Sequence, residues 1–246
     1  EFRRVSSDLG IANFDIGTKT FSNMFEAAQD TTLFPAWPSF TPDAKWVLYQ
    51  LGTTTYTLKG SRAELAALHV PSKTIAKLDA LNGFLAGKNY LPNGESDTRM
   101  NYEPTVLPVA AGGYYWVIFT SRRQYGNTLN QADPFAEKSP RKKLWVAAID
   151  LNAPPGTDPS HPAFYLPGQE LLAGNMRGYW VVDPCKGDDS SCETGDECCG
   201  GYCRPNAGGA LVCTDKVPVC AQEFEKCTKD ADCCGSPSVT CVNGRC

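Results

Sequence analysis

Residues 185–213 read CKGDDSSCETGDECCGGYCRPNAGGALVC, and residues 220–246 read CAQEFEKCTKDADCCGSPSVTCVNGRC. These two stretches contain all 12 cysteines of the chain, and residues 1–184 contain none. Each stretch begins with the spacing C-x6-C-x5-C-C, after which the first continues x3-C-x9-C and the second x6-C-x4-C. The C-terminal part is therefore a tandem repeat of cysteine spacing, with little else shared between the two copies.

Clustered cysteines either bind metals or form disulfides, and this spacing favours disulfides. Zinc sites usually use C-x2-C pairs or histidine, which this stretch lacks, and an adjacent Cys-Cys pair cannot easily turn both sulfurs to one metal. An even number of cysteines with short intervals rich in Gly, Asn and Pro is typical of a disulfide framework. Each bond closes a loop of roughly 15 residues and contributes about 3 kcal/mol. Spacing alone does not choose among the possible pairings.

The cysteine spacing resembles that of the inhibitor cystine knot, or knottin, family, once in each half of residues 185–246. The resemblance implies that the first cysteine pairs with the fourth, the second with the fifth and the third with the sixth. The implied bonds are Cys185 to Cys199, Cys192 to Cys203 and Cys198 to Cys213, then Cys220 to Cys234, Cys227 to Cys241 and Cys233 to Cys246. Modules of this size bury too little apolar surface to fold unaided, so the bonds would replace a core.

The residues before the cysteines alternate short apolar stretches with turn signals, which favours an all-β fold. The chain has 18 Pro and 22 Gly, more suited to many turns than to long helices. We expect a hairpin of residues 9–14 and 19–24, and a strand over 45–50 that follows the turn Thr41-Pro42-Asp43-Ala44. Further strands are expected over 64–70, 74–78, 103–109, 114–120, 143–150 and 175–182.

Residues 35–49, PAWPSFTPDAKWVLY, resemble the TolB-like β-propeller repeat. The hallmark of that family is a Pro-x-Trp-Ser-Pro-Asp-Gly-Lys turn before an aromatic or aliphatic strand, and Ala44 stands where glycine is usual. A weaker copy covers residues 103–120. The resemblance implies a partial β-propeller over residues 1–184, of about three blade equivalents, followed by cystine-knot modules at 185–213 and 214–246.

A closed propeller needs at least about four blades. We therefore expect the missing blades to come from an upstream portion of a precursor or from a second copy of the chain. The chain opens Glu1-Phe2-Arg3-Arg4 without an initiator methionine, although a disulfide-dense tail needs an oxidising compartment. The expectation is a secreted or surface-displayed protein, bacterial in type, whose export signal lay upstream.

Charge and hydropathy argue against two classes of partner. The formal net charge is −4, and residues 185–246 carry 10 acidic against 6 basic residues while the rest has 17 of each. A nucleic-acid binder would instead show a basic face. No apolar run is long enough to span a membrane.

The sequence offers little for catalysis, so we predict a protein that is not an enzyme and has no cofactor. It has two histidines, His69 in an expected strand and His161 in a Pro-rich turn, and we expect structural roles for both. Nucleophile elbows, zinc-protease motifs and phosphate-binding loops are missing from the sequence. The acidic residues within 188–197 lack the alternating spacing of a calcium loop, which favours a solvated acidic surface over an ion site.

Two groups of residues are candidates for binding. Basic residues and one tyrosine flank a long insertion after the expected 114–120 strand: Arg122, Arg123, Tyr125, Arg141, Lys142 and Lys143. They form either a patch for an anionic glycan or acidic neighbour, or a solvated loop, since Glu137 lies nearby. The expected strands also carry aromatic residues: Trp37, Trp46, Tyr114, Trp116, Trp145, Tyr179 and Trp180. Packing between blades is their expected role, with carbohydrate binding by an exposed subset as the alternative.

These observations favour a non-catalytic extracellular or cell-surface binding and assembly module. In this interpretation the propeller is a rigid platform and the knots are a protease-resistant contact surface, and the partner is a protein, further copies of the chain or a surface glycan. Two alternatives remain: a knottin-borne inhibitor or toxin-like effector, and the non-catalytic C-terminal part of a larger secreted hydrolase.

Overall fold

The computed structural model describes residues 8–28, 32–58, 60–92, 94–124, 141–170, 173–182, 185–216, 220–236, 238–242 and 244–246. The chain divides into two compact units, Glu1–Trp180 and Val181–Cys246. The first, the sheet unit, lacks cysteine, and the second, the cysteine unit, contains all 12. Strands are the main regular structure among the described residues and helices are few, so the all-β expectation is confirmed.

The sheet unit begins with an isolated antiparallel hairpin. Strands β1 (Leu9–Asp15) and β2 (Thr20–Ala28) pair only with each other among the described residues. The Thr18 backbone N–H donates to the Asp15 carboxylate at 2.6 Å, which closes the connecting turn. The hairpin expected from the sequence is therefore confirmed, with β2 running further than predicted.

The first four-stranded sheet is an antiparallel meander of β3 (Phe34–Phe40), β4 (Trp46–Gly52), β5 (Ala63–His69) and β6 (Thr74–Lys77). Its first turn forms even though Ala44 replaces glycine, with Ala44 at φ 57°. The Ala44 N–H donates to the Thr41 carbonyl at 2.9 Å, and the Thr41 hydroxyl donates to Asp43 at 2.7 Å. The Pro-Asp turn thus determines the hairpin here.

The second four-stranded sheet repeats the same up-and-down order. It consists of β9 (Asn101–Val106), β10 (Tyr114–Ser121), β11 (Lys143–Asp150) and β12 (Phe164–Tyr165). Short elements connect the two sheets: α1 (Asp79–Asn82), β7 (Phe84–Leu85), β8 (Lys88–Asn89) and α2 (Glu95–Thr98). The Asn82 side chain pairs with both backbone groups of Leu65, at 3.0 and 2.8 Å, and so joins α1 to β5.

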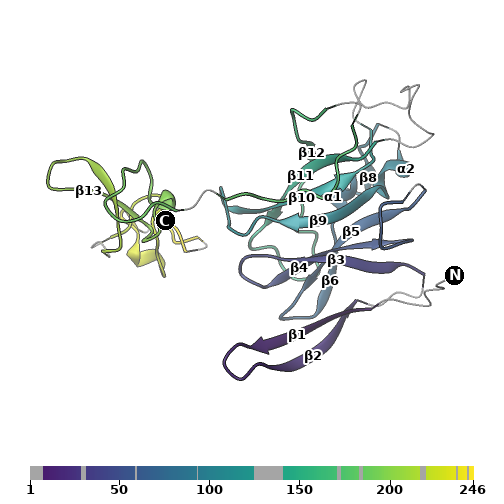
Figure 1. Ribbon diagram of the computed structural model, residues 1–246, viewed down its shortest axis with the longest axis horizontal. Helices are drawn as coiled ribbons and strands as arrows, with labels where there is room; N and C mark the ends of the chain where they lie inside the picture. The colour runs from purple at the N-terminus through teal and green to yellow at the C-terminus, as the bar shows by residue number, and fades with distance from the viewer. Residues whose placement is uncertain are drawn as a thin grey trace. The chain divides into compact units, whose positions relative to one another are not determined.

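Two apolar clusters stack the hairpin and both sheets into three layers (Figure 1). The larger cluster lies between the sheets and includes Trp46, Leu48, Val117, Phe119 and Trp145. The smaller one covers the other side of the first sheet, where the alternate strand residues Val47 and Tyr49 meet Ile11, Ala27 and Ala28 of the hairpin. Because neighbouring strand residues face opposite sides, the first sheet is buried on both faces. The described residues do not close into a ring.

The strand expected over residues 175–182 does not form, and that prediction is wrong. This segment is attached to the second sheet through side chains. The Trp180 indole N–H donates to the Thr105 carbonyl at 2.9 Å, and Arg177 Nε donates to the Thr105 hydroxyl at 3.4 Å. Gly178 lies directly against Ile118, where a Cβ atom would come within 2.7 Å of Ile118 Cδ1. Ile118 faces away from the core of Val117 and Phe119, so the segment lies on the outer face of this sheet.

The cysteine unit has little regular structure. It contains one hairpin, β13 (Tyr202–Pro205) and β14 (Leu211–Thr214), and two 3₁₀ turns, η1 (Gly195–Glu197) and η2 (Asp230–Asp232). Each 3₁₀ turn lies between the second and third cysteine of its repeat, so the two copies share local structure as well as spacing. Four buried cysteines form the apolar cluster of the first module: Cys192, Cys198, Cys203 and Cys213.

Candidate functional site

The 12 cysteines form six disulfides and none is free. The bonds join Cys185–Cys199, Cys192–Cys203, Cys198–Cys213, Cys220–Cys234, Cys227–Cys241 and Cys233–Cys246. This is the pairing that the cystine-knot resemblance implies, in both modules.

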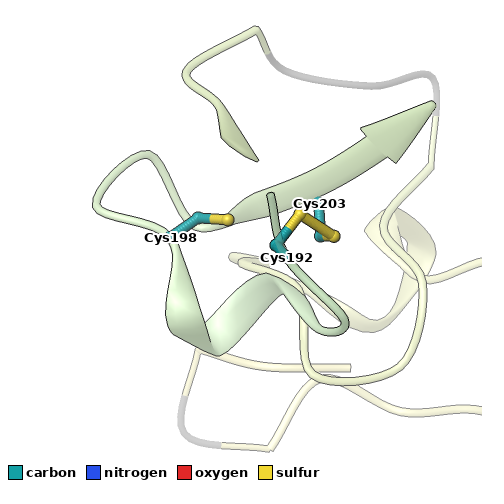
Figure 2. Close-up of side chains that lie close together, drawn as sticks. All are labelled: Cys192, Cys198 and Cys203. Atoms are coloured by element: carbon teal, nitrogen blue, oxygen red, sulfur yellow. A yellow bond between two sulfur atoms is a disulfide. The ribbon is translucent and has the colours of Figure 1, made fainter. Parts of the chain in front are cut away.

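The sulfurs also approach one another closely across different bonds. Figure 2 shows Cys192 bonded to Cys203 with Cys198 beside them, and the three sulfurs lie within 4.8 Å. All three are already oxidised, whereas zinc takes thiolates, so these groups do not make a metal centre. Within the described ranges, only cysteines gather in threes among potential metal ligands. The carboxylates of the acidic stretch 188–197 form no such group of three among the described residues.

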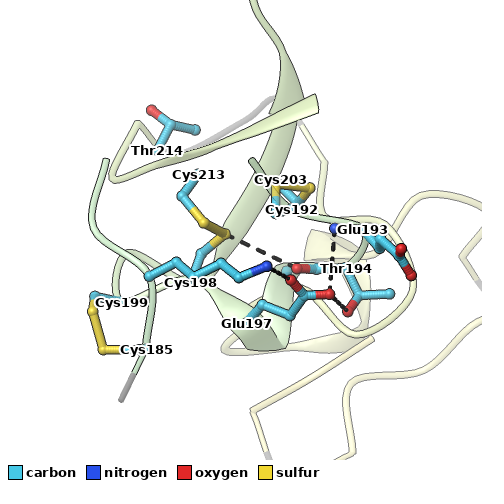
Figure 3. The surroundings of a disulfide bond; sticks show 12 residues. Cys185, Cys192, Glu193, Thr194, Glu197, Cys198, Cys199, Cys203, Cys213 and Thr214 are labelled. Carbon is cyan, nitrogen blue, oxygen red and sulfur yellow. Dashed lines mark hydrogen bonds and ion pairs between the residues drawn. A yellow bond between two sulfur atoms is a disulfide. The ribbon is translucent and has the colours of Figure 1, made fainter. Parts of the chain in front are cut away.

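A carboxylate before each adjacent cysteine pair caps the neighbouring 3₁₀ turn. Glu197 accepts from the Glu193 backbone N–H at 3.3 Å and the Thr194 hydroxyl at 3.4 Å, and it pairs with Lys186 (Figure 3). The hydrogen bond from Lys186 is the largest of the contacts that lower the pKa of Glu197.

The second module repeats this cap with the shorter Asp232. Its carboxylate accepts from the Thr228 hydroxyl at 2.6 Å and from the Thr228 N–H at 2.8 Å. These bonds, with a weaker one from the Lys229 N–H, lower the pKa of Asp232. Two of the acidic residues of the cysteine unit, Glu197 and Asp232, thus stabilise the 3₁₀ turn of their own module.

A buried carboxylate, Glu225, joins the two cysteine modules. It is 1% exposed and accepts from the Cys203 N–H at 3.2 Å and the Gln222 N–H at 2.6 Å. Arg204 of the first module pairs with Glu225 and donates to the Cys220 carbonyl at 2.8 Å. The two modules are therefore joined by an ion pair, and this pair also bonds to backbone groups of both modules. Sequence analysis missed Glu225. Nothing in its distance from the cysteines, or in its charge, distinguishes it from the nearby Glu223.

Two glycines make room for this junction. A Cβ atom on Gly195 would lie 2.6 Å from Glu225 Cγ, and one on Gly201, whose φ is +85°, would lie 3.1 Å from Lys226 Cβ. Arg245 of the second module donates to the Gly195 carbonyl of the first at 3.5 Å and to the Phe224 carbonyl of its own module at 3.0 Å. Close approach of the two modules thus depends on the absence of side chains at these positions.

The predicted basic patch is only partly at the surface. Arg123 is 1% exposed and donates to the Leu81 carbonyl at 2.7 Å and to Asn101 Oδ1 at 2.6 Å. Its guanidinium lies over the rings of Phe119 and Trp145, and burial lowers its pKa. Arg123 is therefore a core residue, which corrects its assignment to a binding surface.

Lys143 is also buried, which again corrects the patch. Its ammonium group donates to the carbonyls of Glu170 and Ala173, the latter at 2.7 Å, and burial lowers its pKa. It fixes the loop that follows β12 to the start of β11. Tyr125 lies outside the described residues, and Arg141 is half-buried.

The remaining patch residues, Arg122 and Lys142, meet at Thr57. Lys142 Nζ donates to the Thr57 hydroxyl at 3.1 Å, and Arg122 donates to the Thr57 carbonyl at 3.3 Å. The Thr57 hydroxyl in turn donates to the buried Glu103 carboxylate at 3.4 Å, which also accepts from Thr120 at 3.3 Å. Through Thr57, the two cations thus belong to a connected polar network that includes the buried Glu103 carboxylate.

The predicted aromatic residues separate into core and surface groups. Trp46 and Trp145 are buried between the sheets as expected, while Tyr179 is 69% exposed. The Arg177 guanidinium contacts the rings of Tyr179 and Trp37, with its Cζ 5.1 and 4.9 Å from their centroids. Sequence analysis identified both aromatics but not the arginine that contacts them, because Trp37 meets Arg177 only through folding.

The two histidines lie in local contacts within the sheet unit. His69 Nδ1 is 2.8 Å from the Ser72 hydroxyl, and its ring packs on Trp46. His161 packs on Tyr114, with Nε2 3.6 Å from Asp150. His69 thus lies beside the hydroxyl of Ser72, in the turn after β5, and His161 beside the carboxylate of Asp150.

No family model matches this chain, and comparisons with the curated proteins and with the solved structures find no match. Among the described helices, none is long and apolar enough to cross a membrane. The six disulfides suit an oxidising, extracellular environment. The functional argument therefore depends on the chain's own geometry.

Proposed function

We propose that this protein is a non-catalytic, secreted or cell-surface binding and assembly module. In this proposal the sheet unit is a section of a TolB-like β-propeller, and the cysteine unit is a pair of knottins that presents a protease-resistant contact surface. The hairpin β1–β2 joins copies of the chain to one another.

Two features support the propeller part of the proposal. The sheets β3–β6 and β9–β12 are both four-stranded antiparallel meanders, as propeller blades are, and they pack face to face through a shared apolar core. The hairpin packs on the other face of the first sheet and so continues the stack, but it has only two strands. It therefore corresponds to half of a four-stranded blade.

The assembly proposal is based on the exposed apolar side chains at the turn end of this hairpin. Phe14 and Phe21 face each other across the strands with ring centroids 4.9 Å apart, yet they are 51% and 69% exposed. Ile16 and Met24 beside them are 83% and 76% exposed. Four large apolar side chains in one short hairpin make the kind of exposed patch that marks an interaction surface.

A second copy of the chain would cover this patch in a simple way. Antiparallel pairing of the free hairpin edge with the same edge of another copy is compatible with twofold symmetry. The result is a sheet of four strands, the same number as in the other two layers. One contact would satisfy the open backbone edge and bury Phe14 and Phe21.

The cysteine unit is suited to contact because it is small, cross-linked and partly apolar on its surface. Phe224, Leu211 and Val242 are each about half exposed. Phe224 is also held at φ 64°, with its backbone N–H donating to the Cys246 carbonyl at 2.9 Å. A bulky residue in this conformation on a disulfide-bonded loop is typical of a contact residue rather than of a folding requirement.

The test is the mass of the native protein in solution by light scattering after size-exclusion chromatography. We expect a particle larger than the 26.7 kDa chain, and we expect the double variant Phe14→Ser, Phe21→Ser to shift it to the monomer with unchanged circular dichroism. Ile75→Ser is the matched control, because Ile75 is an exposed strand residue outside the hairpin. A wild-type protein that stays monomeric at every concentration would contradict the assembly proposal.

A further inference from the structure

The outer face of the second sheet carries an arginine that is held in place but has no acidic partner. Arg177 lies in the segment that follows the sheet, and its guanidinium contacts the rings of Trp37 and Tyr179. Its Nε donates to the Thr105 hydroxyl at 3.4 Å. Within the part of the chain that the structure describes, Arg177 makes no ion pair.

The surrounding contacts fix the orientation of this guanidinium. Trp37 is itself anchored, since its indole N–H donates to the Thr55 carbonyl at 2.6 Å. Trp180, three residues along from Arg177, donates to the Thr105 carbonyl at 2.9 Å. The segment is thus attached at both Arg177 and Trp180 to a single residue of β9, and the arginine loses little further freedom when a ligand binds.

Within the described residues, the two terminal nitrogens of Arg177 make no hydrogen bond. The guanidinium contacts two rings and its Nε donates to Thr105, so Nη1 and Nη2 are the donors left for a ligand. A planar pair of N–H donors matches the two oxygens of a carboxylate, or two oxygens of a sulfate. Neutral hydroxyls alone would not balance the charge of this group.

Beside Arg177 the site has an exposed aromatic ring, that of Tyr179. It is 69% exposed, so one face contacts Arg177 while most of its surface meets solvent. An exposed ring offers the flat apolar surface on which the C–H groups of a pyranose pack. Met176, three residues before Tyr179 in the same segment, is also exposed. A cation with a flat apolar neighbour is complementary to an acidic sugar, which has both an anionic group and an apolar face.

We propose that Arg177 and Tyr179 form a binding site for an anionic sugar residue of a polysaccharide, bearing a carboxylate or a sulfate. Arg177 donates two hydrogen bonds to the anionic group, and the sugar ring stacks against Tyr179. Residues 1–184 carry 17 acidic and 17 basic residues, so binding depends on this site and not on a general positive field. The proposal is independent of the hairpin contact and of the knots.

The experiment is calorimetric titration of the full oxidised protein with four polymers: polygalacturonate, dextran sulfate, neutral dextran and poly-glutamate. We expect binding to one or both acidic polysaccharides and none to neutral dextran. Preference for polygalacturonate identifies a carboxylate as the ligand group, and preference for dextran sulfate identifies a sulfate. Equal binding of poly-glutamate would overturn the proposal, because only charge would then be recognised, and so would no binding to either acidic polysaccharide.

Variants distinguish the contributions of the Arg177 guanidinium and the Tyr179 ring from that of net charge. Arg177→Gln is expected to weaken binding at least tenfold, and Arg177→Lys nearly as much, because lysine keeps the charge but loses the planar pair of donors. Tyr179→Ala is expected to weaken binding severalfold while Tyr179→Phe retains it. The controls are Arg99→Gln and Tyr56→Ala, an exposed arginine and an exposed tyrosine elsewhere on the sheet unit. Full binding by Arg177→Lys, or an equal loss in the controls, would contradict the assigned site.

Discussion

At the scale of single residues, the charges that matter in this protein are those that the fold has buried. Glu225 lies at the junction of the two cysteine modules with one ion pair and two backbone N–H donors. Removing one partner of such a pair is costly, because the other charge is left without compensation in a poorly solvated position. The disulfides hold each module separately, so the junction between them depends on this carboxylate.

Glu225→Ala is therefore expected to loosen the contact between the modules while each keeps its own fold. The expected loss is about 3 kcal/mol, which corresponds to roughly a hundredfold faster hydrogen exchange. The informative amides are those of Cys203 and Gln222, which donate to Glu225. The exposed neighbour Glu223 supplies the matched control, Glu223→Ala. Unchanged exchange at both amides would show that the ion pair does not hold the junction.

Asp232 gives a pH-dependent prediction at the same scale. Its pKa in the folded protein is lowered from 3.8, chiefly by the hydrogen bond from the Thr228 hydroxyl. Because the folded value is the lower one, its contribution to stability is present above pH 3.8 and is lost as the pH falls through the folded pKa. A carboxyl NMR titration should find Asp232 titrating below 3.8, and Thr228→Val should move the pKa upward. A midpoint that does not respond to Thr228→Val would argue against this cap.

At the scale of elements, local turn chemistry was predictable and long-range contacts were not. The Pro-Asp turn and the alternating strands around it depend on residues that are close together in the chain. The strands β3–β6 and β9–β11 could therefore be predicted from the sequence. The links between sheets involve residues far apart in the chain, such as Asn82 with Leu65, and these have no local signal. For the same reason Arg123 and Lys143 seemed to be surface charges, because their partners are backbone carbonyls that only the fold supplies.

Residues 175–180 show how packing decides whether a strand-like sequence becomes a strand. Gly178 lets the backbone lie directly on Ile118, which positions Arg177 and Trp180 over Thr105. Gly178→Ala would place a methyl group within 2.7 Å of the buried Ile118 side chain. We expect a destabilisation of about 1–3 kcal/mol and release of the segment, seen as a change in tryptophan fluorescence. Gly174→Ala is the control, since nothing lies within 4 Å of its added Cβ. Equal effects of the two substitutions would contradict this packing.

At the scale of the whole molecule, the two units are stabilised by different physics. The sheet unit buries an apolar core with large aromatic side chains and has no cysteine. The cysteine unit has disulfides where a core would be, because a module of about 30 residues buries too little apolar surface. Each bond contributes about 3 kcal/mol by restricting the unfolded chain, so without the bonds little remains to hold this unit.

Reduction should therefore unfold one unit and leave the other intact. All five tryptophans lie in the sheet unit, at or before Trp180, so their fluorescence reports on that unit alone. With a reductant at neutral pH we expect the mass to rise by 12 hydrogens and the cysteine unit to become sensitive to protease, while the tryptophan emission stays that of the folded protein. Heating the reduced protein should then shift the emission in a separate transition. A red shift on reduction alone would mean that the sheets need the disulfides, and the division into two independent units would be wrong.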